Sequence, residues 1–376
     1  MIIGIPKEIK NNENRVAITP AGVYALTKLG HKIMIEKTAG NGSGIADSEY
    51  AAAGATMLAD PTDVYDAAEL VVKVKEPVEQ EYNYFREGQS LFTYLHLAPN
   101  PELTEALVKR KVTAIAYETV QLPSGIHPLL SPMSEVAGRM SIQVGASMLQ
   151  TYHGGSGILL GGVPGVHPAE VLIIGGGVVG ANAAKMASGL GARVTIMDIS
   201  KDRLSYLDDI FSGRITTLIY DEYSAAEMVK RADLLVGAVL VTGARAPKIV
   251  SEDMVKSMKK GSVIVDVAID QGGSIATIDR ATTHDNPCYE KYGVIHYSVA
   301  NMPGAVPRTS TFALTGATLP YLVKLAQKGV KQALLDNKDK ALLTGLNTCN
   351  GCITYEAVAH SFNTEYVPAE KCLEEM

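Results

Sequence analysis

Long hydrophobic runs are missing from this 376-residue sequence. A membrane-spanning helix needs about 20 consecutive apolar residues, whereas the longest candidate, residues 234–241, is much shorter and contains glycine. The residues after Met1 also lack the basic stretch and long apolar run of a secretory signal. We therefore expect a cytoplasmic protein that has no membrane partner.

An excess of positive charge is also missing. The chain has 34 Lys and Arg residues against 40 Asp and Glu residues, which gives a formal net charge of −6. Because a nucleic-acid-binding protein presents a basic face, we expect no nucleic-acid partner. Hydrophobic residues make up 47% of the chain, which is typical of a soluble globular protein, and the length fits two domains better than one.

Cysteine is scarce: the chain contains only Cys288, Cys349, Cys352 and Cys372. Four cysteines in a chain of this length do not indicate a disulfide framework. Cys349 and Cys352 have CxxC spacing, but a structural zinc site needs a second pair of ligands, and a redox CxxC usually starts a helix after a strand. This pair lies in a loop rich in Gly, Asn and Thr, so we expect reduced loop cysteines.

Short apolar runs alternate with helical stretches along the chain. The expected strands of the first part are residues 2–6, 31–36, 70–75, 91–97 and 112–117. Strands that alternate with helices predict a parallel α/β sheet.

A long helical pattern over residues 132–152 separates two α/β units, and the second unit runs from residue 171 to about 299. The helices after Pro303 are too few for a domain, so we expect them to return to the first one. The expected domains are therefore 1–128 with 306–376, and an inserted domain, 129–305.

A glycine-rich turn follows the first strand of the inserted domain. Residues 171–174 lead into Gly175-Gly176-Gly177-Val178-Val179-Gly180 and then into a helix. In this G-x-G-x-x-G pattern, Gly175 permits a tight turn, Gly177 lets the backbone approach a pyrophosphate, and Gly180 lets helix and strand pack closely. The helix N-terminus favours the phosphate charge.

An acidic residue, Asp198, ends the next strand, about 20 residues further on, where an acid binds the ribose hydroxyls and disfavours a 2′-phosphate. The pattern predicts two Rossmann-like α/β domains, of which the inserted one is a doubly wound parallel sheet that binds NAD. Later strands end near Val239, Leu240 and Asp270, and the carboxyl ends of such strands face the ligand crevice.

Three residues of the first domain stand in the first loop or at strand ends: Arg15, Lys75 and His96. Arg15 offers a planar fork suited to a carboxylate. His96 can exchange a proton near neutral pH, which amine oxidation requires. Each also has an ordinary structural interpretation, as a solvated charge or a packed histidine.

Six stretches closely resemble alanine dehydrogenases, and the resemblance covers essentially the whole chain. They are GIPKEIKNNENRVAITP (4–20), VKVKEP (72–77), YLHLA (94–98), SPMSEVAGR (131–139), DVAIDQGG (266–273) and VANMP (299–303). The resemblance implies reversible oxidative deamination of L-alanine to pyruvate and ammonium with NAD, in a homohexamer.

The resemblance also implies roles for individual residues. Arg15 and Lys75 would hold the substrate carboxylate, His96 would be the general acid/base, and Asp270 would orient the reacting amine. Further substrate-binding residues would be Tyr94, Leu130, Met133 and Asn301, the first three as walls for the alanine methyl group or as ordinary core. The NAD-contacting positions would be Ser134, Val178, Val179, Asp198, Arg203, Val239, Leu240, Val267, Ala268, Ile269, Asp270, Arg280, Val299, Ala300, Asn301 and Met302.

No metal site is expected, because Lys324 and Lys328 stand where some members of the family hold a metal. The nearest alternative is an NAD(H)-binding module of a transhydrogenase, without amino-acid turnover. The absence of membrane segments and the presence of both Lys75 and His96 favour the enzyme. A saccharopine dehydrogenase and a non-catalytic NAD-sensing scaffold are further alternatives.

Overall fold

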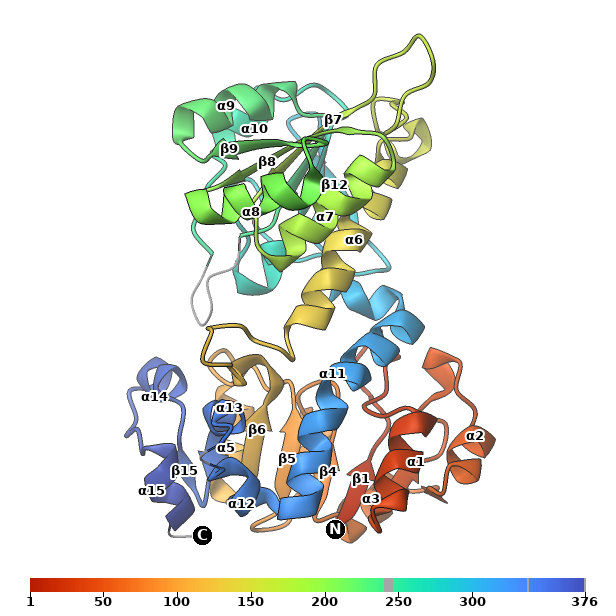
Figure 1. Ribbon diagram of the computed structural model, residues 1–376, viewed down its shortest axis with the longest axis vertical. Coiled ribbons are helices and arrows are strands. Elements are labelled where there is room, and N and C mark those ends of the chain that lie inside the picture. Colours follow the sequence, from red (N-terminus) through yellow and green to blue (C-terminus); the bar gives the residue numbers. More distant parts are fainter. Residues whose placement is uncertain (240–245, 337, 375–376) are drawn as a thin grey trace. The chain divides into compact units, whose positions relative to one another are not determined.

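The computed structural model describes residues 1–239, 246–336 and 338–374. The chain forms two compact units (Figure 1): unit 1 comprises Met1–Met133 and Val306–Met376, and unit 2 comprises Ser134–Ala305. Each unit is built on a mainly parallel sheet with helices, as the sequence predicts. No helix in the described part of the chain has the length and hydrophobicity needed to span a bilayer.

Unit 1 contains an eight-stranded sheet in the order β15-β14-β6-β5-β4-β1-β2-β3. The strands are β1 (Ile2–Ile5), β2 (Lys32–Glu36), β3 (Thr56–Leu58), β4 (Leu70–Val72), β5 (Ser90–Thr93), β6 (Thr113–Ala116), β14 (Leu346–Cys349) and β15 (Cys352–Ile353). The strands from β1 to β6 pair in parallel, and β14 and β15 add an antiparallel hairpin at β6. The strand order reverses between β1 and β4, where such sheets bind ligands.

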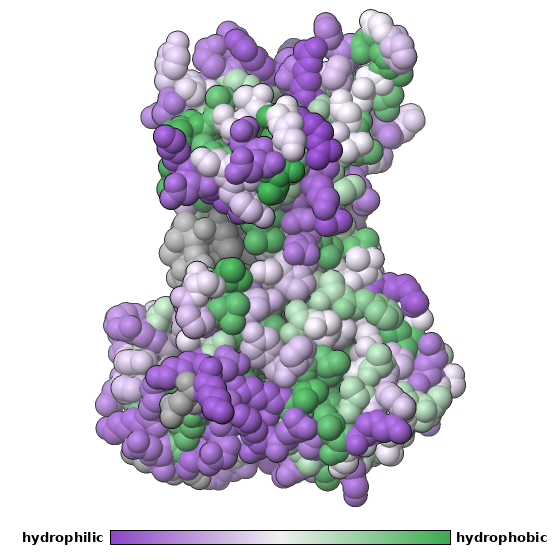
Figure 2. Space-filling model, viewed as in Figure 1, coloured by the Kyte–Doolittle hydropathy of each residue, from purple (hydrophilic) through white to green (hydrophobic). Residues whose placement is uncertain are grey.

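Helices cover this sheet, and all residues of β4, β5 and β6 are buried, as expected for a parallel sheet. The helices are α1 (Pro20–Lys28), α2 (Asp47–Ala52), α3 (Pro61–Ala67), α4 (Glu79–Tyr82), α5 (Pro101–Lys109), α11 (Pro307–Lys328), α12 (Val330–Leu334), α13 (Ala341–Thr344), α14 (Glu356–Phe362) and α15 (Ala369–Glu374). Thr19 caps α1 by accepting the N–H of Gly22, and Pro20 occupies the first turn. Figure 2 shows hydrophobic residues gathered over α11, where Phe312 is exposed.

Unit 2 contains a seven-stranded sheet in the order β12-β13-β11-β10-β7-β8-β9. The strands are β7 (Glu170–Ile174), β8 (Arg193–Asp198), β9 (Thr216–Ile219), β10 (Leu234–Gly237), β11 (Val263–Asp266), β12 (Cys288–Lys291) and β13 (Val294–Tyr297). Only β12 pairs antiparallel with its neighbour. The order reverses between β7 and β10, which makes this the predicted doubly wound sheet.

Helices lie on both faces of the unit 2 sheet (Figure 1), and side chains of β7 pack against both layers. Leu172 and Ile174 pack in a core with residues of α9 (Glu222–Arg231) and α10 (Glu252–Lys256). Ile173 faces Gly180 of α7 (Val178–Gly189), and α8 (Lys201–Phe211) packs on β8 and β9. A strand with both faces covered must be apolar on both, which is why β7 reads as a continuous hydrophobic run.

Several predicted elements are too long. The strand expected over residues 91–97 ends at Thr93 as β5, and His96 adopts a left-handed conformation with φ +49°. The strand expected over residues 70–75 ends at Val72 as β4. The long helix α6 (Ser131–Met148) ends before the predicted residue 152. In each case the hydrophobic pattern of the sequence continues after the strand or helix has ended.

Candidate functional site

The segments that follow β1, β4, β5 and β6 carry the polar residues of unit 1. Parallel strands end at one edge of their sheet, so Arg15, Lys75 and His96 belong to the same edge. This edge includes the point where the strand order reverses. The ligand edge of unit 1 is defined here by these three residues and their contacts.

Arg15 is buried, with 2% of its surface exposed, and Glu13 holds it. Glu13 accepts from Nε at 2.7 Å and from Nη2 at 2.5 Å, while Nη1 lies 3.1 Å from Sδ of Met133. Burial alone would lower the pKa of Arg15, but Glu13 raises it above its ordinary value. The guanidinium therefore stays charged in a fixed orientation, and Glu13 is a site residue that the sequence did not identify.

His96 lies just beyond β5 and is held through its backbone. Glu118 accepts the N–H groups of Leu95 at 3.1 Å and of His96 at 2.7 Å, and its Oε1 lies 3.7 Å from Nδ1 of His96. The His96 side chain keeps 41% of its surface exposed. An accessible imidazole beside a carboxylate is suited to proton exchange. Glu118, which follows β6 directly, was also missed.

Tyr94 fixes the other side of His96. Its ring is parallel to the imidazole, at a centroid distance of 6.0 Å, and its hydroxyl donates to the carbonyl of Leu129 at 2.6 Å. Burial raises the pKa of Tyr94, so the phenol stays neutral. Leu130, the next residue along the chain, is half-buried, and Met133 is 8% exposed. Tyr94 and Met133 thus both contact residues of the ligand edge.

Lys75 is a cation without an ion-pair partner among the residues that the structure describes. Its neighbour Glu76 pairs instead with Lys10. Burial would raise the pKa of Glu76, but Lys75, Lys10 and His96 together lower it. Lys75 therefore remains available to an anionic ligand.

A buried ion network lies beneath Lys75. The ammonium of Lys73, which is fully buried, lies 3.3 Å from Oε2 of Glu8 and 2.7 Å from Oε1 of Glu81. Oε1 of Glu8 accepts the N–H groups of Val74 at 2.6 Å and of Lys75 at 3.3 Å. Glu8 therefore connects the buried ammonium to the backbone of Lys75.

In unit 2 the glycine turn occupies the reversal between β7 and β10. Gly175 has φ +107°, and a Cβ there would lie 2.6 Å from the carbonyl oxygen of Ala238. A Cβ on Gly180 would lie 1.8 Å from the carbonyl oxygen of Gly175, whereas one on Gly177 would have no neighbour within 4 Å. Gly177 and Val178 are exposed at the start of α7, and Val179 is half-buried. The turn thus leaves open space where a phosphate group can approach the backbone.

Asp198 and Arg203 hold the turn from β8 and α8. Asp198 accepts the N–H groups of Gly176 at 2.7 Å and of Ser200 at 2.8 Å. Arg203 donates through Nε to the carbonyl of Gly176 at 2.5 Å. The structure therefore brings both predicted residues to the glycine turn.

The segment after β11 is organised around Asp266, which is fully buried. Its carboxylate accepts the backbone N–H groups of Ala268 at 3.0 Å, Ser274 at 2.7 Å and Ile275 at 3.2 Å. Lys248 donates to the carbonyls of Gly272 and Ile275, at 2.8 and 3.1 Å. Side chains therefore bind both the N–H groups and the carbonyl groups of this segment.

The remaining predicted residues of unit 2 are spread along four segments. Val267, Ala268, Ile269 and Asp270 form a 3₁₀ turn, Val267–Gln271, and Val239 follows β10. Leu240 and the side chain of Asp270 lie outside the described residues. Ser134 lies in α6, and Val299, Ala300, Asn301 and Met302 follow β13; Asn301 has φ +64°.

Arg280 lies in a local cluster. It stacks on Tyr289, with 4.1 Å between Cζ and the ring centroid, and pairs with Asp279 at 3.3 Å.

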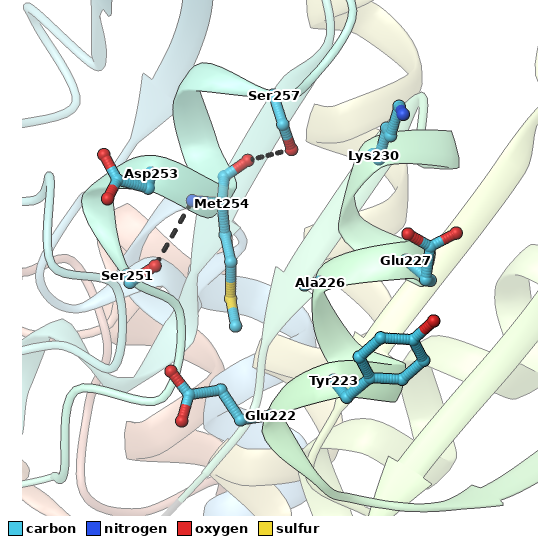
Figure 3. A pocket seen from close by; sticks show the side chains of 9 residues that line it. All are labelled: Glu222, Tyr223, Ala226, Glu227, Lys230, Ser251, Asp253, Met254 and Ser257. Atoms are coloured by element: carbon cyan, nitrogen blue, oxygen red, sulfur yellow. Dashed lines mark hydrogen bonds between the residues drawn. The ribbon is translucent and has the colours of Figure 1, made fainter.

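A groove of about 640 Å³ lies between α9 and α10 (Figure 3). Its lining includes Glu222, Glu227 and Asp253, with Lys230 as its cation. None of the predicted site residues lines it. An open, mainly acidic groove does not suit an anionic dinucleotide, so it is separate from the candidate site.

Among the described residues, no group of three or more His, Cys, Asp and Glu side chains is arranged to hold a metal ion. Lys324 pairs with Asp336 at 3.2 Å and Asp339 at 3.0 Å, and Lys328 pairs with Asp336 at 2.6 Å.

Comparison with known families covers nearly the whole chain. Residues 4–137 match the family "Alanine dehydrogenase/PNT, N-terminal domain", and residues 141–356 match "Alanine dehydrogenase/PNT, C-terminal domain". The chain belongs to the alanine dehydrogenase/PNT family. This confirms the resemblance on which the sequence interpretation rests.

Individual members of the alanine dehydrogenase/PNT family match at full length. The alanine dehydrogenase of Methanococcus maripaludis is 65% identical over 375 residues, which cover 100% of both chains. That of Bacillus subtilis is 62% identical and is covered to 98%. A solved L-alanine dehydrogenase superimposes with a TM-score of 0.93 at 53% identity, over 96% of this chain and 99% of its own.

A transhydrogenase from Sinorhizobium meliloti superimposes with a TM-score of 0.79 at 24% identity, covering 95% of this chain and all of its own. At this identity the likeness shows a shared fold alone.

Proposed function

We propose that this protein is an NAD-dependent L-alanine dehydrogenase, which converts L-alanine reversibly to pyruvate and ammonium. The observation that carries the proposal is the ligand edge of unit 1, where Glu118 holds an accessible His96 on the sheet edge that also carries the cations Arg15 and Lys75. An amino-acid substrate needs cations for its carboxylate and a base for its amine. The full-length similarity to alanine dehydrogenases supports alanine as the amino acid.

In this mechanism the chain's own side chains bind substrate and move protons. Two cations bind the substrate carboxylate: Arg15, which Glu13 orients, and Lys75. The planar guanidinium of Arg15 and the ammonium of Lys75 together fix the direction of the carboxylate. His96 takes a proton from the substrate ammonium group and releases it to solvent, which its exposed side chain reaches; it then takes a proton from the water that attacks the imine and returns it to the departing amine. Glu118 keeps His96 in its left-handed conformation and stabilises the imidazolium.

The glycine turn of unit 2 fits NAD, because the absence of a side chain at Gly177 leaves open space for the pyrophosphate. A Cβ at this position would occupy that space. NAD bound there would supply the acceptor for the hydride of the substrate α-carbon. The cofactor-contacting residues would be those at the turn and strand ends, with Asp198 on the ribose hydroxyls. Asp270 would orient the reacting amine, and Tyr94, Leu130, Met133 and Asn301 would enclose the small substrate.

The deciding experiment follows NADH absorbance with NAD and L-alanine, and with serine, glutamate and saccharopine as alternatives. We expect strong turnover with alanine alone. His96→Ala should lose about 10²–10⁴-fold in kcat, Glu118→Gln about 10- to 100-fold, and the exposed His360→Ala should be unaffected. NADH binding without turnover of any amino acid would instead indicate a transhydrogenase-type module.

We also propose that the enzyme is a cytoplasmic homohexamer. The hydrophobic surface over α11, where Phe312 is exposed, supports self-association, and Tyr24 is exposed on α1, a helix that contacts α11. Light scattering should give a mass of about 240 kDa, six times the 40.0 kDa chain. A 40 kDa species that retains full activity would contradict the assembly but not the reaction.

A further inference from the structure

Three of the four cysteines meet at the outer edge of the unit 1 sheet. Cys349 and Cys352 are cross-strand partners in β14 and β15. Cys372, in α15, donates its thiol to the carbonyl of Cys349 at 2.9 Å and also hydrogen-bonds with the thiols of Cys349 and Cys352. These three cysteines, none of which forms a disulfide, are called the thiol cluster. The CxxC pair therefore lies at two strand ends with a third thiol, and not in a loop as expected.

Of the thiol cluster, only the residue Cys352 is partly exposed to solvent. Cys349 and Cys372 are buried, at 0% and 1% exposure, whereas Cys352 is partly exposed. Burial raises the pKa of Cys349 and of Cys372, so both keep their protons at neutral pH. An oxidant arriving from solvent therefore meets Cys352 first.

The hairpin geometry decides which partner Cys352 can take. Thr354 donates its backbone N–H to Asn347 at 2.8 Å, which makes these two a hydrogen-bonded pair. Such pairs recur at every second position of an antiparallel ladder, so Cys349 and Cys352 form the next one. The Cβ atoms of a hydrogen-bonded pair are about 5.5 Å apart, beyond the roughly 3.5–4.5 Å of a disulfide. Cys372 approaches from a helix and is not bound by this spacing.

We propose that the thiol cluster is an oxidative modification site, at which a hydroperoxide converts Cys352 and Cys372 into an intrachain disulfide. In the first step the Cys352 sulfur attacks the peroxide O–O bond, giving a sulfenic acid and releasing an alcohol, or water from hydrogen peroxide. In the second step the Cys372 sulfur displaces hydroxide from the sulfenic sulfur, and its proton leaves with that hydroxide as water. The two thiols lose two electrons and the peroxide gains them.

The bond would connect α15 covalently to the hairpin at β6, which α15 now contacts through the hydrogen bond from Cys372 to the carbonyl of Cys349. Neither Cys352 nor Cys372 belongs to the ligand edge, so activity should be retained after oxidation. The modification is therefore independent of the proposed reaction.

The test treats the full-length protein with hydrogen peroxide and counts thiols in denaturant. We expect four thiols per chain to fall to two, with recovery on reduction, and a peptide cross-link between Cys352 and Cys372 by mass spectrometry. Cys288→Ser, in unit 2, should fall from three thiols to one. Cys352→Ser and Cys372→Ala should each form no intrachain disulfide.

Three results would overturn the proposal. They are survival of all four thiols, a cross-link through Cys349, and conversion of Cys352 to sulfinic acid without a cross-link. Circular dichroism of Cys352→Ser and Cys372→Ala identifies any variant that misfolds, and the wild-type cross-link map does not depend on either variant.

Discussion

The buried ion network beneath Lys75 offers a matched pair of substitutions. Glu8→Gln and Glu81→Gln each remove one of the two carboxylates around Lys73. Glu8 also accepts the backbone N–H groups of Val74 and Lys75. Glu81 instead accepts the backbone N–H of Val78 and the hydroxyl of Tyr65. The two variants therefore share a stability effect and differ in their effect on Lys75.

The magnitudes follow from these contacts. Removing one partner of a buried ion pair costs about 3–5 kcal/mol, so urea unfolding should detect a similar loss in both variants. A neutral acceptor binds N–H groups about half as strongly as a carboxylate. Glu8→Gln should therefore weaken the support of Lys75 by about 1 kcal/mol, which corresponds to a roughly fivefold change in binding.

Steady-state kinetics in the direction of reductive amination should separate the two variants. We expect KM for pyruvate to rise about fivefold in Glu8→Gln, with kcat and KM for NADH little changed. Glu81→Gln should keep the wild-type KM for pyruvate. Equal KM increases in both variants, or none in either, would refute the idea that Glu8 positions Lys75.

Three further predictions concern unit 2 and the pH response. Gly177→Ala should keep the free energy of unfolding within about 0.5 kcal/mol of the wild type but bind NADH at least tenfold more weakly in a fluorescence titration. Gly180→Ala should lose about 3 kcal/mol or more of unfolding free energy, because its Cβ would lie 1.8 Å from a carbonyl oxygen. Asp266→Asn should lose about 2–3 kcal/mol in urea unfolding, since its amide hydrogens would face backbone donors; an unchanged midpoint would contradict this. Glu76 has a pKa lowered from 4.5, so the ionised carboxylate stabilises the fold above pH 4.5, and this contribution is lost as the pH falls. The loss of unfolding free energy caused by Lys10→Gln should therefore be smaller in acid. An equal loss at pH 7 and pH 3 would argue against a stabilising pair of Lys10 and Glu76.

The sequence predicted those parts of the fold that local patterns determine. The continuous apolar runs at β4 and β7 and the glycine turn at Gly175 each depend on residues within one segment. The ends of β5 and of β4 were placed too late, because apolar residues continue where the backbone leaves the sheet. At His96, Glu118 from the next strand's end stabilises the bend, and no local pattern records that contact.

The candidate site was predicted unevenly for the same reason. Arg15, Lys75 and His96 stand out because charged or titratable residues follow predicted strands. Their partners Glu13, Glu118 and Glu8 are ordinary acidic residues in sequence, and only the folded sheet places them. The approach of Cys372 to the CxxC pair joins residues 20 positions apart and could not be read from spacing.

Unit 1 is built from two segments that are far apart in the sequence, and this delays the completion of its sheet during synthesis. The edge of β6 is covered by β14, whose first residue, Leu346, follows the last residue of β6, Ala116, by 230 positions. At about 5–20 residues per second, this edge stays unpaired on the ribosome for roughly 10–50 s, while the continuous unit 2 can already fold. An unpaired strand invites association with other chains, so the nascent protein has a period in which a chaperone should matter most.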